Sequence, residues 1–65
     1  MIPEKIRSMR PGEGILLNDK DGPRFFFSIP IAGWYCVSDR KRGIRVWTKD
    51  LSVVESLIPE KEVVQ

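Results

Sequence analysis

Short apolar and alternating runs dominate residues 14–48, and turn-forming residues separate them. This pattern predicts β-strands, because successive side chains of a strand point to opposite faces of a sheet. The Asp21-Gly22 pair is typical of a hairpin turn, and the loop 39–43 ends in Gly43, which can take the positive φ that such a loop requires. The candidates for three or four antiparallel strands are residues 15–17, 24–29, 34–38 and 44–48.

Two features of these strands bear on how they are arranged. In the last candidate, Ile44 and Val46 point one way, toward the expected core. Arg45 and Trp47 point the other way, toward a face that is at least partly solvated. Pro30 lacks a backbone N–H, so we expect it to end the second strand or to confine that strand to a sheet edge.

The first nine residues allow two interpretations. Ile2, Ile6 and Met9 recur at helical spacing, and Pro3 suits the first turn of a helix. The alternative is a strand over residues 5–9, and the sequence does not decide between the two.

At the other end of the sequence, Asp50 has the character of a helix N-cap and Pro59 closes the element that follows. The expected buried stripe of this helix is Leu51, Val54 and either Leu57 or Ile58. Residues beyond Pro59 are mostly charged and suggest a frayed tail.

Together these elements predict the α+β class: a small three- to four-stranded antiparallel β-meander with one short C-terminal helix. We expect residues 1–58 to form a single domain and residues 59–65 a flexible charged tail. The expected core is Ile15, Leu17, Phe25, Phe27, Cys36 or Val37, Ile44, Val46, Leu51, Val54 and Ile58.

Composition excludes several catalytic and metal sites. The 65 residues contain no His, which removes Ser-His-Asp and Cys-His catalysis and His-containing zinc sites. Cys36 is the single cysteine of the sequence and is expected to act as a small buried hydrophobe. The segment 18–22 lacks the bidentate glutamate of a calcium loop and predicts a plain turn. We therefore expect no enzymatic activity, no cofactor and no metal.

The lone thiol and an N-terminus without the apolar run of a signal peptide favour a cytoplasmic location. The longest uncharged stretch, residues 25–38, is shorter than the roughly 20 residues that cross a bilayer. We expect no contact with membranes.

Charge is unevenly distributed along the sequence. The net charge is +2, but residues 24–49 carry six positive charges against Asp39 alone, a net +5. Residues 50–65 carry Lys61 against four acidic residues, a net −3. Because arginine can donate two hydrogen bonds to a phosphate and an indole can stack on a base, the middle segment predicts a partner-binding surface. Its candidate residues are Arg40, Lys41, Arg42, Arg45, Trp47 and Lys49.

Two short segments carry a resemblance to a group of proteins. The run from Arg10-Pro11-Gly12-Glu13 to Ile15, followed later by Gly43-Ile44-Arg45-Val46-Trp47, resembles small uncharacterised proteins of bacteriophages and related mobile elements. The resemblance implies a phage-like origin, where DNA-binding regulators and inhibitors of host machinery both occur.

Two hypotheses for function follow. The first is a non-enzymatic, phage-type accessory or regulatory protein that binds nucleic acid through its basic β-hairpin. The second is an inhibitor or interaction module that binds an acidic host protein through a basic loop and the aromatic side chains of Phe26, Trp34 and Trp47. The sequence leaves open whether the tryptophans are buried or exposed. A homo-oligomer is also compatible with the sequence, because small sheets have edges that can pair.

Overall fold

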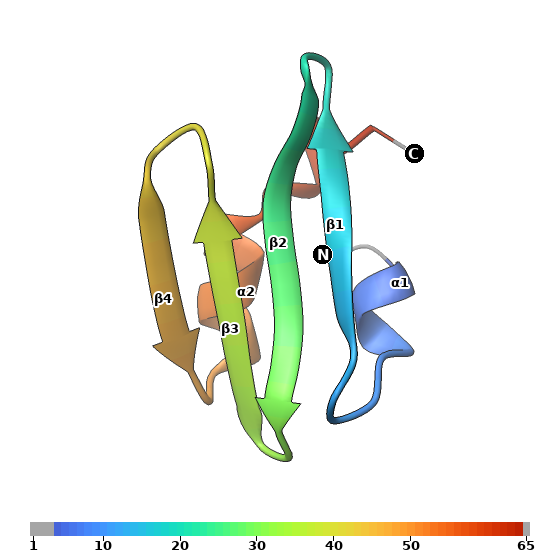
Figure 1. Ribbon diagram of the computed structural model, residues 1–65, viewed down its shortest axis with the longest axis vertical. Helices are drawn as coiled ribbons and strands as arrows, with labels where there is room; N and C mark the ends of the chain where they lie inside the picture. Colours follow the sequence, from blue (N-terminus) through green and yellow to red (C-terminus); the bar gives the residue numbers. More distant parts are fainter. Residues whose placement is uncertain (1–3, 65) are drawn as a thin grey trace.

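Tight turns between successive strands fold the middle of the chain into one antiparallel sheet (Figure 1). The computed structural model describes residues 4–64. Along the chain the elements are α1 (Glu4–Arg7), β1 (Gly14–Asp19), β2 (Gly22–Ile31), β3 (Trp34–Asp39), β4 (Ile44–Thr48), α2 (Leu51–Leu57) and the 3-10 helix η1 (Glu60–Glu62). Strand order in the sheet follows the sequence, β1-β2-β3-β4. The predicted α+β meander is confirmed, with all four strands present.

The ends of the sheet form as the turn residues predict. Gly43 closes the β3–β4 loop with a φ of 67°, and its N–H donates to the carbonyl of Asp39 at 2.8 Å. Near the N-terminus the helical interpretation is confirmed at α1, where Ile6 is buried. Ile2 and Pro3, which that interpretation also used, lie outside the described residues.

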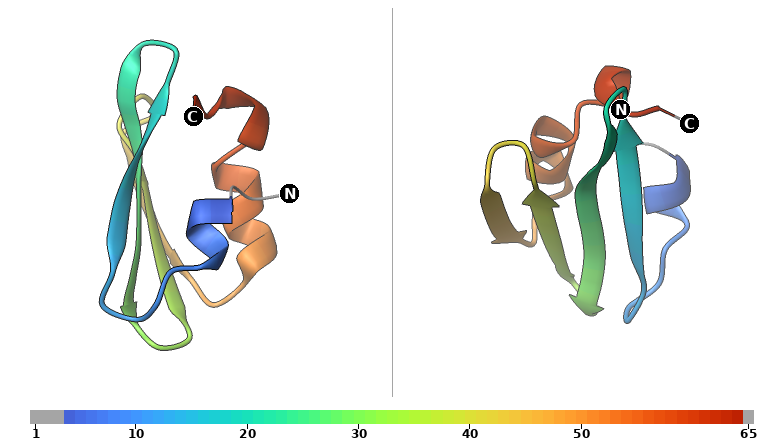
Figure 2. Two further views of the ribbon diagram at one scale, coloured as in Figure 1. Left: turned by 90° about the vertical axis from the view of Figure 1, so that its right-hand side faces the viewer. Right: turned by 45° about the horizontal axis from the view of Figure 1, so that its top comes forward.

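Both helices and η1 lie on one side of the sheet (Figure 2). We call the covered side the inner face and the other side the open face. The core forms between the inner face and the helices. Its buried members are Ile6, Leu17, Phe25, Phe27, Ile29, Val37, Val54 and Ile58.

Four of the expected core residues are not fully buried. Ile44 is 37% exposed and Leu51 is 39% exposed, so the prediction that they are buried is wrong. Val46 is half-buried, so its prediction is only partly confirmed. For Ile44 and Val46 the reason is position, because β4 is an edge strand and its inner-face side chains have a neighbouring strand on one side only. Ile15 is also half-buried, and it packs against the core.

Pro30 does not confine its strand to an edge, which corrects the expectation. β2 continues through Pro30 to Ile31, and it lies between β1 and β3 in the interior of the sheet. The pairing of β2 with β3 is irregular between Ser28 and Ile31, so the missing N–H of Pro30 falls where the regular ladder is already interrupted.

Asp50 caps α2 as expected. Its carboxylate accepts hydrogen bonds from the backbone N–H of Ser52 at 2.9 Å and from the hydroxyl of Ser52 at 2.8 Å. These two bonds lower the pKa of Asp50. Val54 on this helix is fully buried.

The segment beyond Pro59, where the sequence suggests a flexible tail, makes specific contacts. Glu60–Glu62 form η1, and Val63 packs against the core. The N–H of Val64 donates to the carbonyl of Asn18 at 2.8 Å, which adds a bridge to the outer edge of β1.

Candidate nucleic-acid interface

Two rows of side chains cross the open face, because the strand register aligns residues of the same parity. The first row is Gly14, Ser28, Cys36 and Trp47. The second row is Leu16, Phe26, Ser38 and Arg45. Small side chains thus occupy much of this face, and the larger side chains of Phe26, Arg45 and Trp47 project from it. No residue of either row is acidic.

The aromatic side chains of the open face differ in exposure, and neither tryptophan is fully buried. Trp47 is 54% exposed and Phe26 is 43% exposed. Trp34 is half-buried, and its ring meets that of Trp47 edge-to-face with the centroids 6.3 Å apart. This contact leaves more than half of Trp47 exposed.

Phe26 is held close to the sheet by the absence of a side chain beside it. A Cβ placed on Gly14 would lie 2.9 Å from the tip of the Phe26 ring. The ring therefore lies over Gly14, on the neighbouring strand, and is partly ordered before any partner arrives. Phe26 and Trp47 are two strands apart, roughly 10 Å at the usual strand spacing, so they would contact different bases.

Basic side chains accompany the aromatic ones. The Nζ of Lys49 lies 5.0 Å from the centroid of the Trp34 ring, within cation–π range. Arg45 is exposed, and its Nε donates to the hydroxyl of Ser38 at 3.3 Å. Arg40 and Arg45 both line a shallow depression of about 380 Å³, so two guanidinium groups border one surface hollow.

Arg42 is also exposed, but its guanidinium is already bonded to neighbouring groups. Its Nε donates to Oδ2 of Asp39 at 2.8 Å, and its Nη2 donates to the carbonyl of Leu57 at 3.1 Å. These bonds tie the β3–β4 loop to the end of α2, and they give Arg42 a structural role.

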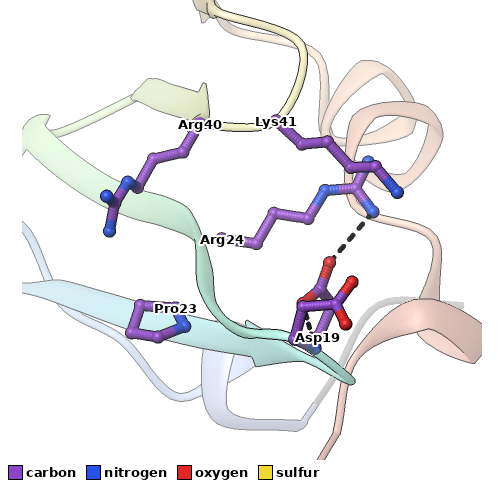
Figure 3. Close-up of a pocket in the computed structure, with 6 residues that line it drawn as sticks. Asp19, Pro23, Arg24, Arg40 and Lys41 are labelled. Atoms are coloured by element: carbon purple, nitrogen blue, oxygen red, sulfur yellow. Dashed lines mark hydrogen bonds and ion pairs between the residues drawn. The ribbon is translucent and has the colours of Figure 1, made fainter.

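Arg40 and Lys41 are both exposed at the loop but point in opposite directions (Figure 3). Together with Arg24 they border a second depression of about 440 Å³ between the β1–β2 and β3–β4 turns. Lys41 extends to the side where Arg24 meets Asp19. Of the two, only Arg40 also lines the hollow beside Arg45.

A buried ion cluster centred on Arg24 and Asp39 lies at the same end of the sheet. Arg24 is 7% exposed and Asp39 2%. Nε and Nη2 of Arg24 donate to the two carboxylate oxygens of Asp39 at 3.0 and 3.1 Å. Nη1 of Arg24 also donates to Glu62 at 3.1 Å and lies 3.6 Å from Asp19.

The electrostatics of this cluster follow from its hydrogen bonds. The bond to Asp39 raises the pKa of Arg24, in opposition to burial, so the guanidinium stays charged. Burial alone would raise the pKa of Asp39, but bonds from the guanidinium groups of Arg24 and Arg42 and from two backbone N–H groups lower it to about 2. Arg24 and Asp39 are therefore both charged at neutral pH.

Alternation along β2 does not predict the role of Arg24, because a bulge redirects its side chain. Leu17 pairs with Phe25, but Asn18 pairs with Pro23, so Arg24 is the extra residue of β2 at that point. A bulge turns a side chain away from the direction that strict alternation assigns. The weak signal available was Asp39 itself, a single acidic residue in an otherwise basic segment.

The structure therefore divides the predicted site. Arg45, Trp47 and Lys49 gather on or beside the open face with Phe26 and Trp34, and Arg40 stands at its end. Lys41 points away and Arg42 is bonded to Asp39. No protein family, curated protein or solved structure matches the chain. Within residues 4–64, no helix has the length and apolar character needed to span a membrane.

Proposed function

We propose that this protein binds single-stranded nucleic acid on the open face of its sheet. One observation carries the proposal: Phe26, Trp34 and Trp47 share a face that no helix covers, and the charged side chains beside them are basic. Stacking on aromatic rings with cations along the strand is the usual basis of single-strand binding by small β-domains.

The individual roles follow from exposure and position. Trp47 and Phe26 are the stacking residues, because their rings are the most exposed on the face. Arg40, Arg45 and Lys49 are the phosphate contacts. The open face replaces the hairpin tip as the binding element, because Arg42 is engaged by Asp39 and Lys41 points away.

The two layers also differ in net charge: residues 14–49 carry seven basic against three acidic residues, whereas residues 4–13 and 50–64 carry four basic against six acidic ones. The acidic residues 50, 55, 60 and 62 all belong to the segment that covers the inner face or continues beyond it. A polyanion approaching the open face therefore meets the positive side of the molecule, which favours its encounter.

The first test is binding of a fluorescently labelled oligothymidylate of about 16 nucleotides, an upper site size for one small β-domain. Trp47→Ala should weaken binding by about 1–3 kcal/mol, since one stacked base is lost. Val64→Ala, which shortens an exposed apolar side chain at the β1 edge of the sheet, is the matched control and should bind as the wild type does. Equal losses in the two variants would contradict the proposal.

Salt dependence tests the cations separately. Three phosphate contacts predict that the logarithm of the association constant falls with the logarithm of salt with a slope of about −2. Arg45→Ala should bring this slope closer to zero by about 0.7, and Arg7→Ala on α1 should leave it unchanged. Failure to bind DNA or RNA at about 50 mM salt would reject the proposal. Capture of an acidic protein through Trp47 would then support the interaction-module hypothesis.

A further inference from the structure

The two edge strands of the sheet, β1 and β4, differ in whether another segment pairs with their outer side. The outer edge of β1 receives Val64, whose N–H donates to Asn18. At the other edge, β4 pairs only with β3 among the residues described. β4 contains no proline, no bulge in its pairing with β3 and one charged residue, Arg45, so it lacks most features that prevent edge strands from pairing with other chains.

Apolar side chains with a core pattern are left in solvent at this same edge. Ile44 and Val46 are on the inner face of β4, and Leu51 shares a helix side with the buried Val54. Ile44 and Leu51 nevertheless remain more than a third exposed. A further strand beside β4, with its own helical layer, would cover them.

The direction of the free backbone groups follows from one hydrogen bond. Arg40 donates its N–H to the carbonyl of Arg24 at 3.0 Å, directly beside the Phe25–Asp39 pair. A bond in that position flanks a non-hydrogen-bonded pair, so the backbone groups of Asp39 face β4. Alternation along β4 then directs the backbone N–H and C=O groups of Ile44, Val46 and Thr48 toward β3. The N–H and C=O groups of Arg45 and Trp47 point outward, away from the sheet.

We propose that two copies of this protein pair antiparallel through β4, with Val46 facing the partner's Val46 on a two-fold axis. In this register Arg45 lies opposite the partner's Trp47. Because the outward backbone groups belong to these two residues, each Arg45–Trp47 pair exchanges both of its N–H···O bonds. Every outward-facing backbone group of Arg45 and Trp47 is then satisfied.

Side-chain chemistry favours this register over its neighbours. Directly opposed side chains on the same face of two paired strands interact, and a guanidinium beside an indole is an attractive pair. The smallest shift that keeps the two faces matched is two residues, and in one direction it would place Arg45 opposite the partner's Arg45, which is a like-charge contact. A shift in the other direction would place Arg45 opposite the partner's Lys49, with the same repulsion. The strand is complementary to itself only when it is centred on Val46.

The pairing would produce one continuous sheet of eight strands from two four-stranded ones. A two-fold axis perpendicular to the sheet keeps both helical layers on the same side. The open faces of the two copies would therefore form one surface.

Disulfide trapping tests the register in the full-length chain carrying Cys36→Ala, which leaves one introduced thiol. Val46→Cys should form a covalent dimer under mild oxidation, because directly opposed Cα atoms of a non-hydrogen-bonded pair are about 4.5 Å apart. Ile44→Cys is the matched control on the same strand and face. Its two copies would be offset by four residues, roughly 14 Å, and should stay reduced. Equal cross-linking of the two variants would indicate random collision and overturn the proposal.

Sedimentation equilibrium without nucleic acid tests association itself, so its outcome is independent of the proposed function. The wild type should approach twice the mass of one chain as concentration rises. Arg45→Pro and Arg45→Ala both remove the guanidinium, but only the proline removes the outward N–H, which an edge strand tolerates. We expect Arg45→Pro to associate at least tenfold more weakly than Arg45→Ala. A wild type that remains monomeric to millimolar concentration, or equal association of the two variants, would overturn the proposal.

Discussion

One carboxylate, that of Asp39, joins three parts of the chain. It accepts hydrogen bonds from the side chain of Arg24 on β2 and from Arg42 and the N–H of Lys41 in the following loop. A buried charge is tolerated only when its partners replace the water that it has lost. The Asp39 carboxylate has such partners on both oxygens, and it therefore fixes the loop geometry that presents Arg40.

Stability should depend on pH through Asp39. Its pKa is about 2 in the folded protein and about 3.9 in an unfolded chain, so between these values the unfolded state binds more protons. The contribution, on the order of 2–3 kcal/mol, is nearly complete above about pH 5 and is lost progressively as the pH falls toward 2. Asp50, whose pKa is also lowered, adds to the loss in the same direction.

Urea unfolding at a series of pH values would measure this loss. The carbon-13 shift of the Asp39 carboxyl group gives its protonation directly, and the Asp50→Ala variant removes the share of the helix cap. An Asp39 carboxyl group that titrates near pH 4 in the folded protein would contradict the expected effect of Arg24 and Arg42.

At the scale of elements, local sequence patterns predicted most of the fold. Strand positions, the Gly43 turn and the Asp50 cap depend on local chemistry, and the sequence contains that chemistry directly. The predicted meander already places the last strand at an edge of the sheet. The exposure of Ile44 and Leu51 depends on how far the helical layer reaches that edge, which alternation does not encode. The bulge at Arg24 also depends on pairing between strands, which a single strand pattern does not encode.

The candidate site was predictable to a similar extent. Arg45 and Trp47 share a face of β4 because alternation requires it, and that part of the expectation is confirmed. The joining of Phe26 and Trp34 to the same surface required the register of three strand pairs. The withdrawal of Arg42 required knowing that Asp39 is buried, since an exposed aspartate would have competed for it only weakly.

Helix α2 should depend strongly on its cap, because it has only seven residues. Asp50→Ala removes the acceptor for both bonds from Ser52, and we expect a loss of about 1 kcal/mol in the free energy of unfolding. Ser56→Ala is the control, since the Ser56 hydroxyl bonds only within the helix, to the carbonyl of Ser52. Alanine favours the helix, so this variant should be as stable as the wild type or slightly more so. Urea midpoints that rank the two variants in the reverse order would contradict the role of the cap.

For the whole molecule, the arrangement of the layers explains why one face is free. Two short helices and η1 all lie over the inner face of the four-stranded sheet, and within residues 4–64 no further helix covers the other face. Residues with short side chains, such as Gly14, Ser28 and Cys36, project little from much of that open face. The exposed aromatic rings thus stand on a rigid sheet rather than on a loop, which limits the entropy lost when a partner binds.

The segment after Pro59 should contribute to the stability of the whole sheet. Deleting residues 60–65 would remove the ion pair of Glu62 with Arg24, the packing of Val63 and the bond of Val64 to Asn18. A partly exposed ion pair contributes up to about 1 kcal/mol and a backbone hydrogen bond about 1, so with the lost apolar burial we expect a decrease of about 2–3 kcal/mol. Urea unfolding measures it, with Lys61→Gln as a control that alters charge in the same turn and should change stability by less than about 0.5 kcal/mol. A truncated chain with the wild-type midpoint would show that these contacts add nothing and that the segment behaves as the charged tail its composition suggests.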